Sequence, residues 1–145
     1  MSNRDFSLVF TVKKDKEAVF DAILNVPGWW SSTLEGRTKA VDDEFTYRHK
    51  KLHVSKHRVT EVVPGERVVW HTLEADIGLG KNRAEWRGTD VRFDVRQSGD
   101  ETEVTFTHLG LRPELECFEA CRRGWTYYVG ESLRALITEG RGTPD

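Results

Sequence analysis

Histidine and large aromatic side chains are the residues whose types and spacing could do chemistry in this chain. His108 ends a run in which Val104, Phe106 and His108 share one face by simple alternation. An imidazole among apolar side chains can hydrogen-bond a ligand, or act as an acid or base near neutral pH. The alternative is a core histidine whose nitrogens are satisfied by neighbouring groups. We take His108 as the candidate polar handle of a ligand site.

The aromatic residues supply flat surfaces suited to an aromatic or alicyclic guest. The chain contains five tryptophans, and core packing is the simpler explanation for any single one. As a set, the aromatic residues favour a lined cavity. The predicted ligand-binding residues are Trp30, Tyr47, Trp70, Phe93, Phe106, His108, Cys121, Trp125 and Tyr128.

A stripe of mostly small residues runs along the last predicted helix. Cys117, Cys121, Gly124 and Tyr128 recur at steps of three and four, which leaves volume opposite a sheet and lets the Tyr128 hydroxyl reach a guest. Close packing of the helix on the sheet is the alternative. We expect both cysteines to be reduced, because thiols four residues apart on a helix are poorly aimed for a disulfide.

The histidines at 49, 53 and 57 have the spacing of a helical metal cluster, but their segment has the pattern of a hairpin. On strands they need not converge, and no carboxylate or thiolate follows at ligand spacing. We therefore predict no metal site. The basic residues among these histidines match no recognised nucleic-acid module, so we expect no nucleic-acid partner.

Sequence motifs of common enzymes are missing. No segment matches a nucleophile elbow, a Cys-His pair or a dinucleotide fingerprint, so we assign no catalytic residue and no cofactor. The glycine-rich segment 78–82 lacks the ending of a phosphate-binding loop. We interpret it as a loop that covers the cavity entrance.

Composition is typical of one globular domain over residues 1–145. Hydrophobic residues make up 37% and charged residues 32%, and the net charge of −2 gives no field that favours nucleic acid. The apolar residues are dispersed, so we expect no membrane insertion. No secretory signal pattern opens the sequence, and we expect a cytoplasmic protein.

Periodicity predicts the elements that must position these residues. A strand over 6–12 is followed by a short helix that begins after Asp15 and ends at Pro27 and Gly28, with one further helical turn around Trp29 and Trp30. A long amphipathic helix over 114–137 comes last, and residues 140–145 are expected to fray. Strand-like segments between them lie near 34–40, 43–50, 53–63, 66–74, 85–97 and 101–109.

These elements indicate an α+β domain. We expect a curved antiparallel sheet of about seven strands wrapped around the C-terminal helix, with a short helical pair after strand one. Such a sheet usually leaves space beneath the helix, and a ligand would bind there.

Three stretches carry a family resemblance that covers nearly the whole chain. Residues 19–36, with Trp29 and Trp30, and the hairpin 88–111 resemble the opening and closing segments of the family named after the activator of the heat-shock protein 90 ATPase. The last helix, with Gly124 and Trp125, is similar to that family's ending. The resemblance implies the helix-grip fold of the START-like (SRPBCC) superfamily, which also includes the birch-pollen-allergen fold.

We weigh three functions for such a domain. The leading one is binding of a small hydrophobic or aromatic molecule by a protein that is not an enzyme. The second is a cyclase or hydratase in which His108 or Tyr128 transfers a proton. The third is a co-chaperone-like interaction module that uses the basic hairpin with Lys50 and Lys51. The co-chaperone itself has a separate client-contacting domain with no counterpart here, so a chaperone partner is not expected, and a homodimer is left open.

Overall fold

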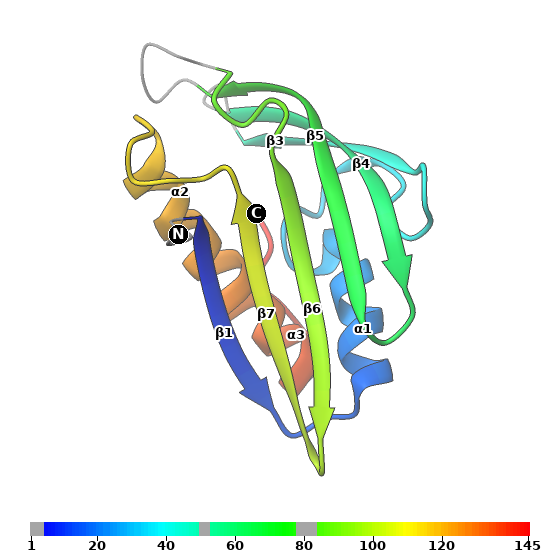
Figure 1. Ribbon diagram of the computed structural model, residues 1–145. Helices are drawn as coiled ribbons and strands as arrows, with labels where there is room; N and C mark the ends of the chain where they lie inside the picture. The colour runs from blue at the N-terminus through cyan, green and yellow to red at the C-terminus, as the bar shows by residue number, and fades with distance from the viewer. Residues whose placement is uncertain (1–4, 50–52, 78–83) are drawn as a thin grey trace.

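A seven-stranded antiparallel sheet with strand order β1-β7-β6-β5-β4-β3-β2 forms the body of the molecule (Figure 1). We describe residues 5–49, 53–77 and 84–145 from a computed structural model, and the glycine-rich segment 78–82 and Lys50 and Lys51 lie outside these ranges. The predicted helix-grip α+β fold is confirmed. The strands are β1 Phe6–Val12, β2 Glu35–Gly36, β3 Glu44–His49, β4 His53–Val63, β5 Arg67–Ile77, β6 Asp90–Ser98 and β7 Glu101–Leu109.

The sheet is built from the hairpins that the sequence pattern predicts. Asp42, before β3, adopts a left-handed backbone conformation (φ 76°). Gly65 (φ 72°) and Gly99 (φ 64°) supply positive φ at the turns between β4 and β5 and between β6 and β7. The first strand pairs with a strand far from it in the sequence: β1 lies antiparallel to β7, with Phe6 opposite His108 and Val12 opposite Thr102. This pairing places β1 at one edge and leaves β2 at the other.

The short helices after β1 begin and end where the sequence predicts. In α1 (Lys16–Leu24), the Asp15 side chain caps the first turn by accepting a 2.9 Å hydrogen bond from the Ala18 N–H. The 3₁₀ turn η1 (Val26–Gly28) follows, with Pro27 in its first turn. Trp29 and Trp30 come directly after it, and both are buried.

Register shifts bend the middle of the sheet. The β4–β5 ladder is interrupted between Lys56 and His57 and again between Val59 and Glu61. Such irregularities increase local twist and curvature, so the sheet curls around the C-terminal helix (Figure 1). The concave face buries the core, whose large side chains include Trp29, Trp70, Phe93 and Phe106.

The C-terminal helix has three parts in place of the single α-helix expected. It runs through α2 (Phe118–Tyr127), the π-helical segment η2 (Tyr128–Leu133) and α3 (Arg134–Glu139). It begins at Phe118 and not at residue 114, because residues 113–117 form turns, with a 3.0 Å bond from Leu115 N–H to Arg112 O. Gly140 in the left-handed conformation ends it (φ 80°).

Two predicted strands are shorter than expected. The segment near 34–40 contributes only the two residues of β2, and the segment near 85–97 begins its strand at Asp90. Residues 84–88 instead form turns that include Gly88 (φ 81°). This change matters because it brings Trp86 under the C-terminal helix.

Residues 140–145 are docked on the domain, contrary to the expectation of a frayed tail. Thr143 N–H donates to Ser132 Oγ (2.8 Å), and Asp145 N–H donates to Trp30 O (2.9 Å). Ser132 Oγ in turn donates to Trp29 O (2.7 Å). The tail thus ties the π-helical segment to the tryptophan pair. None of the helices in the described ranges is long and apolar enough to cross a membrane.

Candidate ligand cavity

A cavity of about 260 Å³ lies between the C-terminal helix, the β3–β4 hairpin and the turn before β6. Its size is just below the range of roughly 300 to 1,000 Å³ typical of small-molecule sites. Most of the lining is aromatic or apolar. The lining residues are Trp30, Tyr47, His49, His53, Trp86, Ala120, Cys121, Gly124, Trp125 and Tyr128.

The structure brings together only part of the predicted ligand-binding set. Trp30, Tyr47, Cys121, Trp125 and Tyr128 line the cavity. The remaining four are absent from the lining and fully buried in the packed core beside it. They are Trp70, Phe93, Phe106 and His108, each with an exposed fraction of 0%.

Stacked aromatic pairs form the cavity walls. The rings of Trp30 and Tyr47 lie 4.2 Å apart at 16°, and those of Trp86 and Trp125 lie 5.5 Å apart at 12°. Trp30 and Trp125 join the two pairs with centroids 4.9 Å apart. Aromatic pairs with these geometries are stabilising beyond their buried area, so the walls are rigid before a guest arrives.

His108 holds two of these walls in place and does not face the cavity. Its Nδ1 accepts a 3.0 Å hydrogen bond from Trp125 Nε1–H, which fixes the proton on Nε2. Nε2 then donates to Thr89 Oγ1 (2.9 Å), and that hydroxyl donates to Trp86 O (2.6 Å). Both ring nitrogens are therefore occupied by protein groups. Burial lowers the pKa of His108 to about 3, so the ring is neutral.

Two further histidines converge on one serine. His53 Nε2 and His57 Nε2 lie 2.9 Å and 2.8 Å from Ser55 Oγ, and His57 Nδ1 lies 3.0 Å from Thr72 Oγ1. Burial lowers the pKa of His53 to about 4 and that of His57 well below its usual range. His49 lies opposite His53 across the hairpin, whereas His57 lies opposite Phe45, four residues further along β4. Within the described residues, however, no group of three or more His, Cys, Asp or Glu side chains is arranged to hold a metal ion.

A polar edge borders the cavity where β3 meets the C-terminal helix and tail. The Tyr47 and Tyr128 hydroxyl oxygens lie 3.3 Å apart, and Tyr47 also donates to Asp145 Oδ2 (3.4 Å). His49 Nδ1 forms a hydrogen bond with the same carboxylate oxygen. Burial raises the pKa of both phenols, so they remain protonated at neutral pH.

The helix side of the cavity is fixed by a capping carboxylate. Glu85, from the turn before β6, accepts hydrogen bonds from the N–H groups of Cys117 (3.0 Å) and Glu116 (3.1 Å). A carboxylate at this position satisfies free N–H groups and complements the helix dipole. Cys117 and Cys121 are free and buried, and their mutual hydrogen bond raises the pKa of Cys117.

The sequence reasoning missed five lining residues. Trp86 falls in a segment expected to be a strand, Gly124 shows only as a small residue on the helix stripe, and Ala120 is not part of that stripe. The spacing of His49 and His53 raises only the question of a metal site, which the hairpin pattern argues against, and does not mark them as cavity walls. The usable signal was their position on one hairpin with Tyr47, since His49 pairs with His53 and Tyr47 pairs with Ser55.

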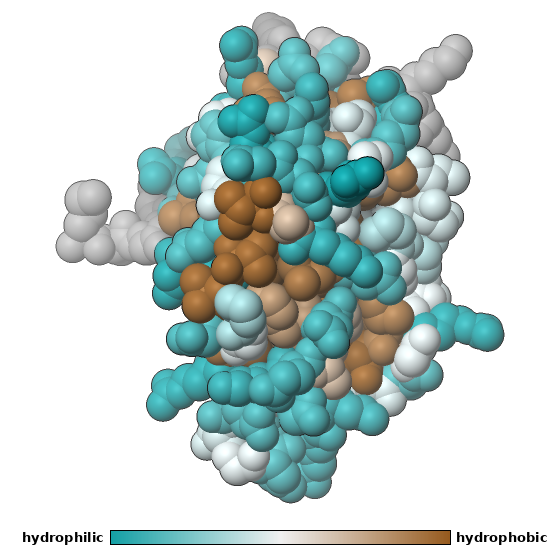
Figure 2. Space-filling model, turned by 90° about the vertical axis from the view of Figure 1, so that its right-hand side faces the viewer, coloured by the Kyte–Doolittle hydropathy of each residue, from teal (hydrophilic) through white to brown (hydrophobic). Residues whose placement is uncertain are grey.

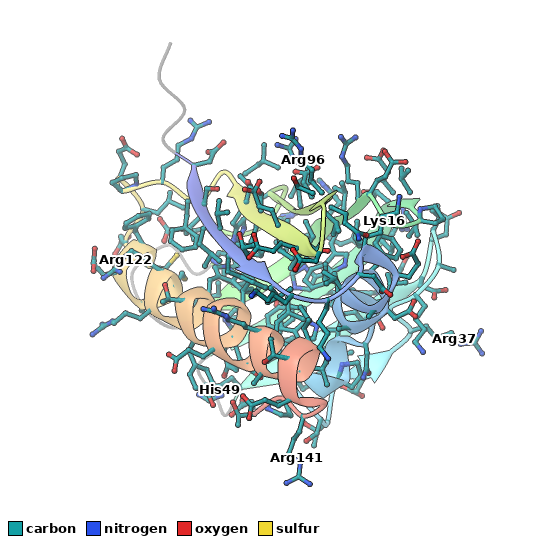
Figure 3. All side chains as sticks on the ribbon, turned by 90° about the horizontal axis from the view of Figure 1, so that it is seen from below. Lys16, Arg37, His49, Arg96, Arg122 and Arg141 are labelled. Carbon is teal, nitrogen blue, oxygen red and sulfur yellow. The ribbon has the colours of Figure 1, made fainter. Side chains whose placement is uncertain are left out.

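The arrangement is suited to holding a flat, uncharged guest. Among the lining residues within 5–49, 53–77 and 84–145, none is a lysine or arginine. The labelled cations in Figure 3 (Lys16, Arg37, Arg96, Arg122 and Arg141) project outward, whereas His49 lies close under the C-terminal helix. The polar edge offers hydrogen-bonding groups at one end of an otherwise apolar space.

Solved structures with the same fold include bacterial proteins of low sequence identity. The Aha1 dimer from Colwellia psychrerythraea is 20% identical with a TM-score of 0.76, covering 95% of this chain and 98% of that one. Protein MLL2253 from Mesorhizobium loti is 14% identical with a TM-score of 0.70, covering 93% and 98%. DynU16, from the dynemicin biosynthetic locus, is 16% identical with a TM-score of 0.67, covering 99% of this chain and 52% of that one.

Sequence comparison identifies the family directly. No curated protein matches the chain. The sequence profile described as activator of Hsp90 ATPase homolog 1-like protein matches residues 14–138, which is most of the chain. This range runs from the end of β1 to the last turn of α3 and includes every cavity-lining residue. The chain therefore belongs to the activator of Hsp90 ATPase homolog 1-like protein family.

Proposed function

We propose that the chain binds a small aromatic molecule in the cavity between its sheet and its C-terminal helix, without catalysing a reaction. The observation that carries this proposal is the cavity itself: about 260 Å³ of space walled by Trp30, Tyr47, Trp86, Trp125 and Tyr128. Rigid stacked walls lower the entropy cost of binding a flat guest. A small-molecule carrier or sensor needs no more than this.

Gly124 offers a direct test because it lies on the helix stripe that faces the cavity. A Cβ added at Gly124 meets nothing within 4 Å, so the space beside it is open. Gly124→Leu places a branched side chain in that space and replaces glycine with a good helix former, which favours α2 by up to about 1 kcal/mol. The variant should fold at least as well as the wild type and bind small aromatic molecules at least tenfold more weakly.

The control is Gly130→Ala in η2, which does not line the cavity. A Cβ there meets only Thr126 Cγ2, at 4.0 Å. Binding is measured by tryptophan fluorescence with a panel of one-ring and two-ring aromatic compounds, and by native mass spectrometry of gently purified protein. Unchanged affinity in Gly124→Leu would place the guest outside the cavity, and an empty protein that ignores the whole panel would refute the proposal.

A homodimer is a second, independent part of the proposed function. The similar Aha1 structure from Colwellia psychrerythraea is a dimer. Figure 2 shows an area of apolar surface enclosed by hydrophilic residues on one face of this molecule, and such areas often mark protein interfaces. Sedimentation velocity over a range of concentrations tests this, and a single monomeric species at all concentrations would exclude the dimer.

A further inference from the structure

The polar edge of the cavity has a defined hydrogen-bonding pattern that follows from Asp145. An ionised carboxylate only accepts hydrogen bonds. His49 Nδ1, which contacts Asp145 Oδ2, must therefore carry a proton. In the neutral imidazole the other nitrogen, Nε2, is then an acceptor. Among the residues that the structure describes, Nε2 of His49 has no hydrogen-bond partner.

The two phenols at this edge are ordered by the same carboxylate. Tyr47 has one hydroxyl proton, and a charged acceptor forms the stronger hydrogen bond, so this proton points to Asp145 Oδ2 at 3.4 Å. Tyr128, 3.3 Å from Tyr47, is the phenol whose proton the carboxylate does not take. Its hydroxyl can donate to Tyr47 or turn to a guest. The cavity edge therefore offers one acceptor, His49, and one donor, Tyr128.

A hydroxyl group is the guest group that complements this pair, because it donates to His49 and accepts from Tyr128 through one oxygen. An anionic guest does not fit the described lining, since none of the lining residues in the described ranges is a lysine or arginine and the Asp145 carboxylate lies beside the cavity edge. A guest that can only accept hydrogen bonds, such as an ether, would leave His49 Nε2 without a hydrogen-bond donor.

We propose that the cavity selects neutral aromatic molecules that carry a hydroxyl group. His49 Nε2 accepts a hydrogen bond from this hydroxyl, and Tyr128 donates a hydrogen bond to its oxygen. Asp145 acts as the positioning residue that sets both partners. This inference rests on the proposed function and specifies its ligand class.

The test compares probes of one shape: 2-naphthol, 2-methoxynaphthalene, naphthalene and 2-naphthoate. We expect 2-naphthol to bind the wild-type protein about tenfold more tightly than the methyl ether, because the ether cannot donate. Naphthalene, which has no oxygen to accept from Tyr128, should bind more weakly than the ether, and 2-naphthoate should also bind more weakly than the ether. Tryptophan fluorescence titration gives each Kd.

Variants separate the two roles. His49→Leu and Asp145→Asn should reduce the preference for 2-naphthol over its ether to near one, while Tyr128→Phe should weaken both probes and leave their ratio unchanged. Glu119→Gln, which removes an exposed carboxylate paired with Arg122, is the matched control and should change nothing.

The outcomes distinguish this inference from the function on which it rests. If naphthalene and 2-naphthol bind equally well and Gly124→Leu weakens both, the cavity binds aromatic molecules but the hydroxyl selection is wrong. Tightest binding by 2-naphthoate would also overturn the hydroxyl selection, because binding of this anion requires a cation that the described lining residues do not provide. If no probe binds, the proposed function fails and the selection fails with it.

Discussion

Trp125 on the C-terminal helix donates its indole proton to Nδ1 of His108 on β7, over 3.0 Å. This bond joins a cavity wall to a histidine that is fully buried beneath it. Because Nε2 of the same ring connects through Thr89 Oγ1 to the carbonyl of Trp86, one neutral imidazole fixes both members of a stacked pair. The histidine that the sequence marks as a polar handle is thus a support for the walls.

Removing His108 should cost more stability than removing a partly exposed histidine. His108→Ala leaves the Trp125 Nε1–H and the Thr89 hydroxyl without their partner and creates a void, and we expect a loss of about 3 kcal/mol. His71→Ala removes a partly exposed ring that pairs with Asp90 at 2.7 Å, and should cost about 1 kcal/mol or less. Urea unfolding measures both. Equal losses would show that the His108 network is not coupled to folding.

Acid should destabilise the fold between about pH 6.5 and pH 4 through the buried histidines. Burial lowers the folded-state pKa of His108 to about 3 and that of His53 to about 4, whereas in the unfolded chain a histidine titrates near 6.5. Below pH 6.5 the unfolded state therefore binds more protons, so the stabilisation present above this pH is lost as pH falls.

The size of this effect follows from the proton uptake of the unfolded state. At pH 5, about 1.5 units below the unfolded pKa, each such group costs up to about 2 kcal/mol. Free energies of unfolding from urea titrations at pH 5 and pH 7 measure the loss, and His53→Asn should flatten the curve. A wild-type stability that does not change over this interval would show that these rings accept protons in the folded state.

Much of the fold follows from the sequence because hairpins are local. Alternation along residues 6–12, 53–63 and 101–109 gives strands with the predicted bounds. Periodicity tells which side chains face inward. It does not tell how far apart the sheet and helix lie at each level of the core.

This limit explains the outcome for the candidate site. Trp70, Phe93 and Trp125 all face inward, but the layers close tightly over the first two and open only beside Trp125. Long-range contacts decide where the opening lies: Glu85 meets the helix start 32 residues away, and Asp145 reaches His49 across 96 residues. Neither contact leaves a local pattern. The periodicity of apolar residues also does not predict the π-helical segment that begins at Tyr128.

Glu85 should control both the start of α2 and the position of Trp86. Glu85→Ala removes the acceptor of the Cys117 and Glu116 N–H groups, and loss of a helix cap typically costs about 1 kcal/mol. Glu85→Gln keeps an acceptor oxygen and should lose less. Thermal unfolding gives the stabilities, and the fluorescence of Trp86, isolated by comparison with Trp86→Phe, reports the wall. If Glu85→Ala and Glu85→Gln behave alike, the charge and not the cap geometry is what matters.

The docked tail should be released by a single methyl group. A Cβ at Gly142 would lie 2.5 Å from Gly28 O and 2.9 Å from Ser132 O, and these are backbone atoms that cannot turn aside. Gly142→Ala should therefore break the bonds of Thr143 to Ser132 and of Asp145 to Trp30, and the amide protons of Thr143 and Asp145 should exchange faster.

Release of the tail removes Asp145 from the polar edge and leaves every aromatic wall of the cavity in place. Gly142→Ala should keep its affinity for naphthalene and lose its preference for 2-naphthol, since His49 is no longer fixed by a carboxylate. Arg141→Ala is the control, because that side chain projects away from the molecule (Figure 3). If the Asp145 amide still exchanges slowly in Gly142→Ala, the backbone accommodates the methyl group and the tail stays docked. If this amide exchanges fast but the preference for 2-naphthol is intact, groups other than Asp145 are responsible for the selection.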